Sequence, residues 1–471
     1  MQKAENFLFK NIFWVILLLS IPAVWTLFVP GFFGASDDLH IAWLHQMDAV
    51  LKLGKFPPRF VPDLSFGFGY PLFNFVFPLP FYIGEIFHLL GLSFVDSIKT
   101  VFLISIPLSG YFMYKFLKEH TSFWLALAGA VIYIYTPYRA TDIYIRGAIG
   151  EVFAFIFPPL IAFAITKITK EKDWKWVSLL GISTAGLILS HNIMAYMFFP
   201  FLVILSLLIG FKLKTFFGFV LGLLISVYFW LPAIVESSLM KYGTGNFNYI
   251  DHFPTIKQLI TPYFGYGASV PGPYDGMSFF MGAVNLILIV TAIIFLRKLN
   301  KQVYSANKVS LWALGIITIS VFMMNFRSTL LWDNLPLIPY FQFPWRFLSL
   351  TTFATSILVI TLDKFKYNKQ IGIALIIGVV ALNFSFFKPH DFLGRTDEYY
   401  LNRYIPNPTA SEEYLKTQEE YLRLPKETEK RPEARSPYMG LDNSFVTDYK
   451  EETIFDYNKY YFPGWTVKID G

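Results

Sequence analysis

Cysteine is absent from this chain of 471 residues, which excludes disulfide bonds, cysteine metal ligands and a cysteine nucleophile. Charged residues are also scarce, at 15%, where a soluble domain has about a quarter. The seven histidines show no H-E-x-x-H spacing. The sequence has no Walker loop, no G-x-G-x-x-G after a strand and no nucleophile elbow. What remains is apolar, since 55% of the residues are hydrophobic and 19% are aromatic.

Apolar segments of about 20 residues recur along the chain, which predicts an all-α polytopic membrane protein. We expect about eleven transmembrane helices, near residues 7–30, 98–114, 122–137, 152–166, 176–190, 193–210, 216–236, 278–296, 309–325, 347–362 and 371–387. Residues 76–92 are the alternative twelfth span. They carry Pro78, Pro80, Glu85 and His88, so we interpret them as a re-entrant or surface segment of the first loop.

The positions of the positive charges predict the orientation. With eleven spans and an inside N-terminus, the inside segments hold 17 Lys or Arg in 51 residues, and the outside loops hold 9 in 145. A twelfth span at 76–92 would turn every later lysine-rich loop outward. We therefore expect a multi-pass protein of the cytoplasmic (inner) membrane, with its C-terminal region outside.

Two domains follow from this reading. Residues 1–387 form the predicted transmembrane domain, whose first outer loop, 31–97, carries surface helices. Residues 388–471 form an extracytoplasmic tail that ends in a strand-like run with Thr466, Val467 and Ile469. The chain stops where a partner strand should begin. We expect the tail to be a small α/β or β-rich domain that this chain contains only in part.

The first outer loop begins with two adjacent carboxylates, Asp37 and Asp38, after Ser36. Ser36 is a candidate helix N-cap with acidic residues in the first turn. One interpretation is capping and dipole compensation; the other is a reaction centre at the membrane surface. We expect His40 to pair with Asp37 and leave Asp38 free, which makes Asp38 the candidate base and Asp37 its rival.

More polar residues gather on the same predicted outer face, in five separated clusters. Charges at a membrane boundary are costly unless they have a function. The further candidate catalytic acid is Glu151, and the candidate substrate-binding residues are His40, Arg59, Asp142, Arg146, His191, Asn192 and Arg346.

The order of these motifs resembles a known family. After the acidic loop come GYPLFNFVFPLPFYIGE, TPYRATDIYIRGAIGE, LSHN, FQFPWRF and YFPGW. The chain resembles bacterial YfhO-type membrane proteins, including those named pyruvoyl-tetrahydropterin-synthase-related, and these are similar to GT-C glycosyltransferases. A pterin synthase needs a histidine zinc site, which this sequence does not show.

The resemblance implies an extracytoplasmic transferase that uses a polyprenyl-phosphate sugar. It implies a key acid in the first outer loop, here Asp37 or Asp38, and a second acid in the next, here Asp142 or Glu151. Oligosaccharyltransferases carry R-x-x-x-G-x-x-D-x-D in that second loop. This chain has one acid, Glu151, at a different spacing after Arg146, so a divalent cation is left open and no other cofactor is implied.

The chemistry agrees with the residue types. Sugar transfer to a hydroxyl needs a carboxylate base, and the lipid-phosphate leaving group needs a cation. Arg346 is the first choice for that cation and Arg146 the second. The implied partners are membrane lipid, the donor and an unnamed glycan, lipid or protein acceptor in envelope or glycoconjugate synthesis, without nucleic acid. The alternatives are a transporter or flippase for lipid-linked glycans, or a non-catalytic envelope-assembly scaffold.

Overall fold

The computed structural model describes residues 8, 10–65, 67–171, 173–241, 248–297, 308–405 and 460–464. Of the described residues, 71% are helical. In these described ranges, extended pairing is limited to two isolated antiparallel bridges, between Val61 and Tyr70 and between Tyr266 and Met277. The helical class that the sequence predicts is therefore confirmed. The expected β-rich or α/β part of the tail, with Thr466, Val467 and Ile469, lies outside the described residues.

In the described part of the chain, five helical segments are long and apolar enough to cross a membrane: Phe94–Lys118, Ile149–Lys170, Asn192–Gly210, Pro344–Leu362 and Asn368–Phe386. The number rises to seven if each of two bent helix pairs is one span. Shorter apolar helices cover Ile12–Phe28, Lys175–Ser190 and Ala283–Phe295. A chain with several such helices is a multi-pass membrane protein, and the count of eleven spans remains a prediction.

The chain divides into two compact units. The larger contains residues 1–37, 99–226 and 247–393, and the smaller contains residues 38–98, 227–246 and 394–471. The boundary falls between Asp37 and Asp38, so the two candidate bases belong to different units. The expected division at residue 387 remains a prediction.

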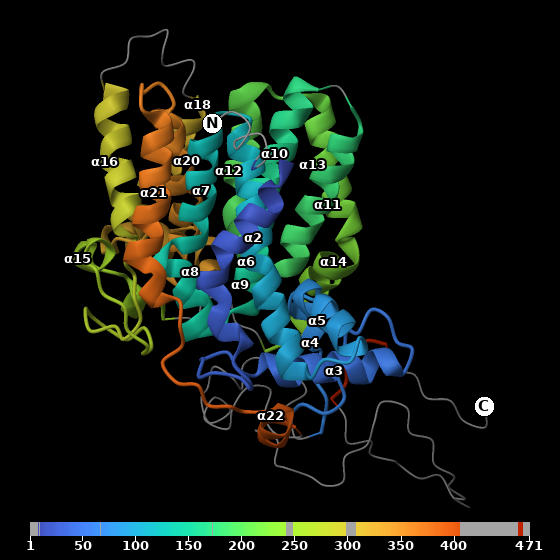
Figure 1. Cartoon of the computed structure of the whole chain (residues 1–471). Helices are drawn as coiled ribbons and strands as arrows, with labels where there is room; N and C mark the ends of the chain where they lie inside the picture. Colours follow the sequence, from blue (N-terminus) through green and yellow to red (C-terminus); the bar gives the residue numbers. More distant parts are fainter. Residues whose placement is uncertain are drawn as a thin grey trace, which may run out of the picture. The chain divides into compact units, whose positions relative to one another are not determined.

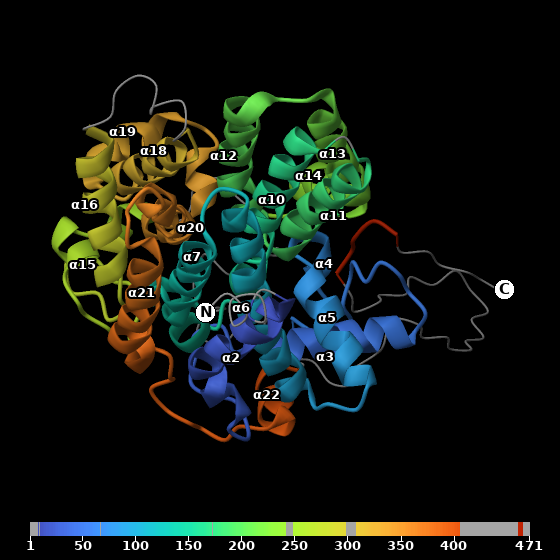
Figure 2. The same cartoon turned by 45° about the horizontal axis from the view of Figure 1, so that its top comes forward.

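The larger unit is a bundle of helices, and α7 runs beside α21 in both views (Figures 1 and 2). Its helices begin and end as follows: α2 Ile12–Val24, η1 Trp25–Phe28, α6 Phe94–Lys118 (its first turn lies in the smaller unit), α7 Phe123–Tyr135, α8 Pro137–Thr141, η2 Asp142–Arg146, α9 Ile149–Ala154, α10 Phe157–Lys170, α11 Lys175–Ser190, α12 Asn192–Gly210, α13 Leu213–Ile225, η4 Tyr249–His252, α15 Ile256–Ile260, α16 Ala283–Arg297, α18 Lys308–Met323, η5 Phe326–Ser328, α19 Thr329–Asn334, η6 Ile338–Phe341, η7 Pro344–Phe347, α20 Leu348–Ile357, η8 Leu358–Leu362, α21 Asn368–Asn383 and η9 Phe384–Phe386.

Glycines let α11 and α13 approach closely. A Cβ added at Gly181 would lie 2.6 Å from the Leu221 side chain, and one at Gly222 would lie 2.5 Å from Thr184 Cβ. Association of membrane helices depends on such close van der Waals packing, because lipid tails are as apolar as leucine. The pair forms one wall of the bundle.

The chain between α7 and α9 folds back into the protein instead of forming an exposed loop. α7 ends before Pro137, whose ring fits the first turn of α8. A single π-helical turn, η2, follows and ends at Gly147, which has a left-handed φ of 67°. Side chains from this turn are buried. The interruption therefore places polar residues of the second loop inside the larger unit.

The smaller unit contains α3 His40–Lys52, α4 Leu72–Phe75, α5 Leu79–Leu89, α14 Val227–Glu236, η3 Ser237–Leu239 and α22 Asp397–Tyr404. α3 and α5 lie side by side (Figure 2). α5 has 11 residues and so extends about 16 Å, whereas the apolar core of a bilayer is about 30 Å thick. The interpretation of residues 76–92 as a surface segment remains a prediction.

The expected N-cap at Ser36 is wrong. α3 begins at His40 after Leu39, and its first turn contains no acidic residue. Asp37 and Asp38 precede the helix and do not compensate its dipole from within the first turn.

Candidate active site

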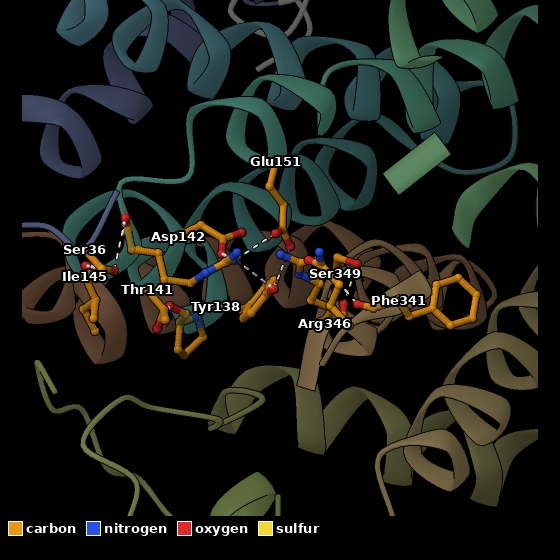
Figure 3. A network of polar contacts seen from close by, with 12 residues as sticks. Ser36, Tyr138, Thr141, Asp142, Ile145, Glu151, Phe341, Arg346 and Ser349 are labelled. Carbon is orange, nitrogen blue, oxygen red and sulfur yellow. Dashed lines mark hydrogen bonds and ion pairs between the residues drawn. The ribbon is translucent and has the colours of Figure 1, made fainter. Parts of the chain in front are cut away.

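Asp37 is fixed by main-chain hydrogen bonds to the π-helical turn η2. The Ser36 amide donates to the Ile145 carbonyl at 3.0 Å, and the Asp37 amide donates to the Arg146 carbonyl at 2.7 Å. The Ser36 hydroxyl donates to the same two carbonyls, and Figure 3 shows Ser36 beside Ile145. The start of the first loop is therefore held against the second, and the Asp37 side chain remains half-buried.

Arg146 is the centre of a buried polar network in the larger unit. Its Nη1 donates to Asp142 Oδ1 at 2.5 Å and to Glu151 Oε2 at 2.7 Å. The Tyr138 hydroxyl donates to the other Glu151 oxygen at 2.6 Å. Figure 3 shows Tyr138, Asp142 and Glu151 converging. Two carboxylates thus share one guanidinium, and such charge-assisted bonds are stronger than neutral ones.

Burial and neighbouring charges both shift the pKa values of Asp142 and Arg146 in this network. Burial and the nearby charge of Glu151 raise the pKa of Asp142 well above its ordinary value, despite Arg146. Burial lowers the pKa of Arg146, but the charges of Glu151 and Asp142 outweigh burial and raise it. Arg146 therefore stays charged, and Asp142 is the acid in this network that most readily holds a proton.

Arg346 and Trp345 lie in the 3₁₀ turn η7 beside this network. Arg346 Nη1 donates to Gln342 Oε1 at 2.5 Å, and its guanidinium carbon lies 5.9 Å from the Trp345 ring centre. The Arg146 guanidinium lies over the same ring at 4.7 Å. Asp37 interacts electrostatically with both arginines. The larger unit therefore brings an acid from the first loop, a second-loop network and a cation from η7 into one site; Figure 3 shows the second-loop residues beside Arg346.

Asp38 has partners of its own in the smaller unit. The Tyr404 hydroxyl donates to Asp38 Oδ1 at 2.5 Å, and Arg395 Nη1 lies 3.7 Å from Oδ2. His40 is buried against Trp43 and Phe81. We expected Asp37 to be held and Asp38 to be free. The contacts favour the reverse, because the tyrosine and the arginine occupy both oxygens of Asp38.

The remaining candidates take different positions. Arg59 belongs to the smaller unit, where Nε donates to Asn74 at 2.8 Å and Nη2 bonds Glu236. His191 caps α12 by accepting from the Met194 amide at 3.1 Å. Asn192 is exposed. No group of three or more His, Asp or Glu side chains among the described residues is placed to hold a metal ion.

Sequence reasoning missed three residues that the structure places in contact with the candidates. Tyr138 binds Glu151, Trp345 stacks on both arginines, and Tyr404 binds Asp38. Tyr138 stands 13 residues before its partner and could have been noticed in the second-loop motif. Tyr404 stands 366 residues after Asp38, and no local pattern links them.

A second buried acidic pair, Asp48 on α3 and Glu85 on α5, lies in the smaller unit. The two carboxyls are within hydrogen-bonding range of each other, and burial together with Asp48 raises the pKa of Glu85 to about 7. Asp48 Oδ1 and Glu85 Oε2 are buried and have no donor among the described residues. Lys52 Nζ pairs with Asp48 Oδ2 at 2.8 Å. A proton on Glu85 removes the repulsion between the two buried carboxylates.

Comparison with known proteins adds a fold and a distant relative. No family model matches the chain. An uncharacterised protein of Lactococcus lactis subsp. cremoris is 26% identical over 219 residues, which are 45% of this chain and 36% of the relative. This chain therefore matches only about a third of that relative's length. The relative does not bear the YfhO-type or pterin name, and that narrower resemblance remains a prediction.

Among solved structures, arabinofuranosyltransferase AftD from mycobacteria is similar, with a TM-score of 0.50 and 12% identity. The match covers 81% of this chain and 27% of AftD. An oligosaccharyltransferase from Archaeoglobus fulgidus gives a TM-score of 0.45 at 13% identity, over 91% of this chain and 61% of that protein, which is too loose to compare in detail. The similarity to AftD shows a shared fold.

Proposed function

We propose that this protein is a membrane glycosyltransferase that moves a sugar from a polyprenyl-phosphate donor to an acceptor hydroxyl outside the cytoplasm, in envelope glycan or glycoconjugate synthesis. The observation that carries the proposal is the site in the larger unit. There the Asp37 carboxylate, the Arg146 network and Arg346 act on one another electrostatically. The fold shared with AftD supports it.

Asp37 is the base in this proposal. It takes the proton of the acceptor hydroxyl while the acceptor oxygen bonds to the anomeric carbon and the bond from that carbon to the phosphate oxygen breaks. The electron pair of the broken bond stays on the lipid phosphate. Asp37 suits this role because it is half-buried and its amide, rather than its carboxylate, holds it in place.

Arg346 stabilises the leaving phosphate, whose negative charge grows as the bond breaks. Its hydrogen-bond partners, Gln342 Oε1 and the Phe341 carbonyl, are neutral. A cation without a carboxylate partner keeps its full charge for an anionic ligand. The Arg146 network, with Asp142, Glu151 and Tyr138, holds the neighbouring turn and the Arg146 charge in place.

The test is a strain that lacks the protein, complemented with wild type or variants, in which lipid-linked sugars and envelope glycans are measured by mass spectrometry. We expect deletion to accumulate one polyprenyl-phosphate sugar and to remove one glycan linkage. Arg346→Ala should reproduce the deletion, with a loss of roughly 2–5 kcal/mol, and Arg346→Lys should be less impaired. Arg327→Ala, at an exposed arginine of η5, is the matched control.

Two outcomes would contradict the proposal. Unchanged lipid-linked sugars and glycans in the deletion strain would exclude a transferase role. Accumulation of the donor on the inner leaflet alone would instead indicate the flippase alternative, since a transferase leaves its donor on the outer side.

A further inference from the structure

The end of α18 forms a groove on the surface of the larger unit. The groove has a volume of about 420 Å³ and is lined by Ile317, Thr318, Val321, Phe322, Asn325 and Arg327. This volume lies within the range of roughly 300–1,000 Å³ that is usual for small-molecule sites. Most of the lining is apolar, and Arg327 is its one charged residue.

The groove lies where an apolar helix turns sharply. The helix Lys308–Met323 is followed by the helical segment Phe326–Asn334 at an angle of 88°. Where α18 crosses the membrane, the second segment therefore runs along the membrane surface. Phe326 and Leu330 of this segment are 61% and 71% exposed, as is usual for apolar side chains that contact lipid at the interface. This geometry places the groove between the apolar core and the headgroups.

The Arg327 guanidinium is exposed, and no carboxylate among the described residues lies within ion-pair distance of it. The nearest acid in the sequence, Asp333, accepts a hydrogen bond from the Tyr249 hydroxyl. Asn325 Oδ1 accepts from the Arg327 amide at 3.1 Å and fixes the turn. Snorkelling to the interface explains the exposure of an arginine but not the apolar groove beside it.

We propose that this groove binds one anionic phospholipid, with an acyl chain along Ile317, Val321 and Phe322 and the phosphate on Arg327. A guanidinium pairs with phosphate oxygens through two parallel hydrogen bonds. An anionic phospholipid has a net negative charge for this pair, whereas phosphatidylcholine carries a cation that balances its own phosphate. Charge and groove together therefore favour the anionic lipid.

This inference is independent of the proposed transferase activity. Asp37, Arg146 and Arg346, to which we assign the reaction, do not line the groove. We therefore assign the groove to a phospholipid of the membrane and not to the sugar donor.

The experiment uses the full chain in nanodiscs that contain phosphatidylglycerol and phosphatidylcholine in equal amounts. Native mass spectrometry counts the phospholipids that stay bound after the nanodisc is removed. We expect wild type to retain one phosphatidylglycerol, preferred over phosphatidylcholine by about fivefold or more, which is the ratio that one basic residue near an anionic headgroup gives.

Two variants separate the charge from the groove. Arg327→Gln removes the charge, so the preference for phosphatidylglycerol should disappear. Val321→Trp fills the groove and keeps the charge, so fewer phospholipids should stay bound. Lys212→Gln, at an exposed lysine before α13, makes the same change of charge away from the groove and should behave as wild type does.

Thermal unfolding checks that the variants are folded. If Val321→Trp does not fold, Arg327→Gln at its exposed position carries the test alone. Sugar transfer by Arg327→Gln should stay at the wild-type rate, because the groove and the candidate active site share no residue.

Four outcomes would overturn the inference. Equal retention of the two phospholipids by wild type would show no selection for an anionic lipid, and an unchanged preference in Arg327→Gln would exclude this cation. Unchanged retention in a folded Val321→Trp would leave only attraction of charges at the surface. Displacement of phosphatidylglycerol by an equal amount of polyprenyl monophosphate would assign the groove to the sugar donor. None of these outcomes decides the transferase activity, which is measured on glycans.

Discussion

The two units bury their acids in different ways. In the larger unit, Asp142 and Glu151 are within 2.7 Å of the Arg146 guanidinium. In the smaller unit, the Glu85 carboxyl is buried near Asp48, and burial together with this neighbour raises its pKa to about 7. An arginine remains charged at any physiological pH, whereas a proton on Glu85 is lost as the solution becomes alkaline. The first arrangement suits a site that must hold an anion, and the second couples helix packing to pH.

The largest expected effect separates the adjacent aspartates. Asp37→Asn keeps the shape of the side chain and removes the base, so sugar transfer should fall by roughly 10²–10⁴-fold. Donor binding and thermal stability should stay near wild type, because the Asp37 amide and not its carboxylate holds the loop. Turnover assayed with the purified protein checks this. Parental turnover in Asp37→Asn would mean that the base lies elsewhere, with Asp38 the first alternative.

The next largest effect concerns Arg146, which stays charged. Arg146→Ala leaves Asp142 and Glu151 buried without their partner, and breaking a buried pair in this way costs about 3–5 kcal/mol of stability. Unfolding in detergent, followed by intrinsic fluorescence against temperature, measures the loss. Adding Asp142→Asn and Glu151→Gln to Arg146→Ala removes the stranded charges and should restore part of the stability. If the triple variant is no more stable than Arg146→Ala, the network is not held together by charge.

The raised pKa of Glu85 gives an intermediate effect that depends on pH. Burial raises the pKa of Glu85 in the folded protein from its ordinary 4.5 to about 7, so the folded state binds this proton more tightly than the unfolded state. The stabilisation is complete below pH 4.5, falls as pH rises and is lost above about 7. We expect a decrease of about 1–3 kcal/mol over this window.

Denaturation at pH 5 and at pH 8 measures this decrease. Glu85→Gln removes the titrating carboxyl and keeps its shape, so it should flatten the pH profile. Glu398→Gln, at an exposed position of α22, is the control and should keep the slope of wild type. The same slope in Glu85→Gln would assign the pH dependence to other groups.

The smallest effect is that of Asp38. Asp38→Asn retains an acceptor for the Tyr404 hydroxyl and loses the charge opposite Arg395, so stability should fall by about 0.5–1.5 kcal/mol. Transfer activity should remain within about threefold of wild type. In this proposal Asp38 contributes to stability through Tyr404 and Arg395 and takes no part in the reaction, and a stability loss of this size is ordinary for a substitution. A loss of turnover like that expected for Asp37→Asn would return the base to Asp38.

The sequence singled out several residues of the candidate site because their physical signals are local. Acids and arginines at span ends are costly in a membrane, so Asp37, Asp142, Arg146, Glu151 and Arg346 could be singled out. The structure brings these five residues into the larger unit. The helical class follows from the same apolar runs.

The orientation of the two aspartates could not be predicted. A spacing argument assumed that Asp37 and Asp38 begin a helix, but the helix starts at His40. Their directions are set by partners remote in the chain, the carbonyls of Ile145 and Arg146 on one side and Tyr404 on the other. The π-helical turn that buries Arg146 also has no local signature, since its backbone is fixed by surrounding contacts.

The main-chain amides of residues 36 and 37 donate two hydrogen bonds to η2, and these bonds join loops that are more than 100 residues apart in the sequence. Both hydrogen bonds are made by the main chain. A different side chain at residue 37 would therefore start from the same backbone position. The side chain at residue 37 can therefore be replaced without moving the backbone. A library of substitutions at residue 37 would show how transfer activity depends on the side chain alone. Proline there would remove the amide donor and with it this fixed backbone position.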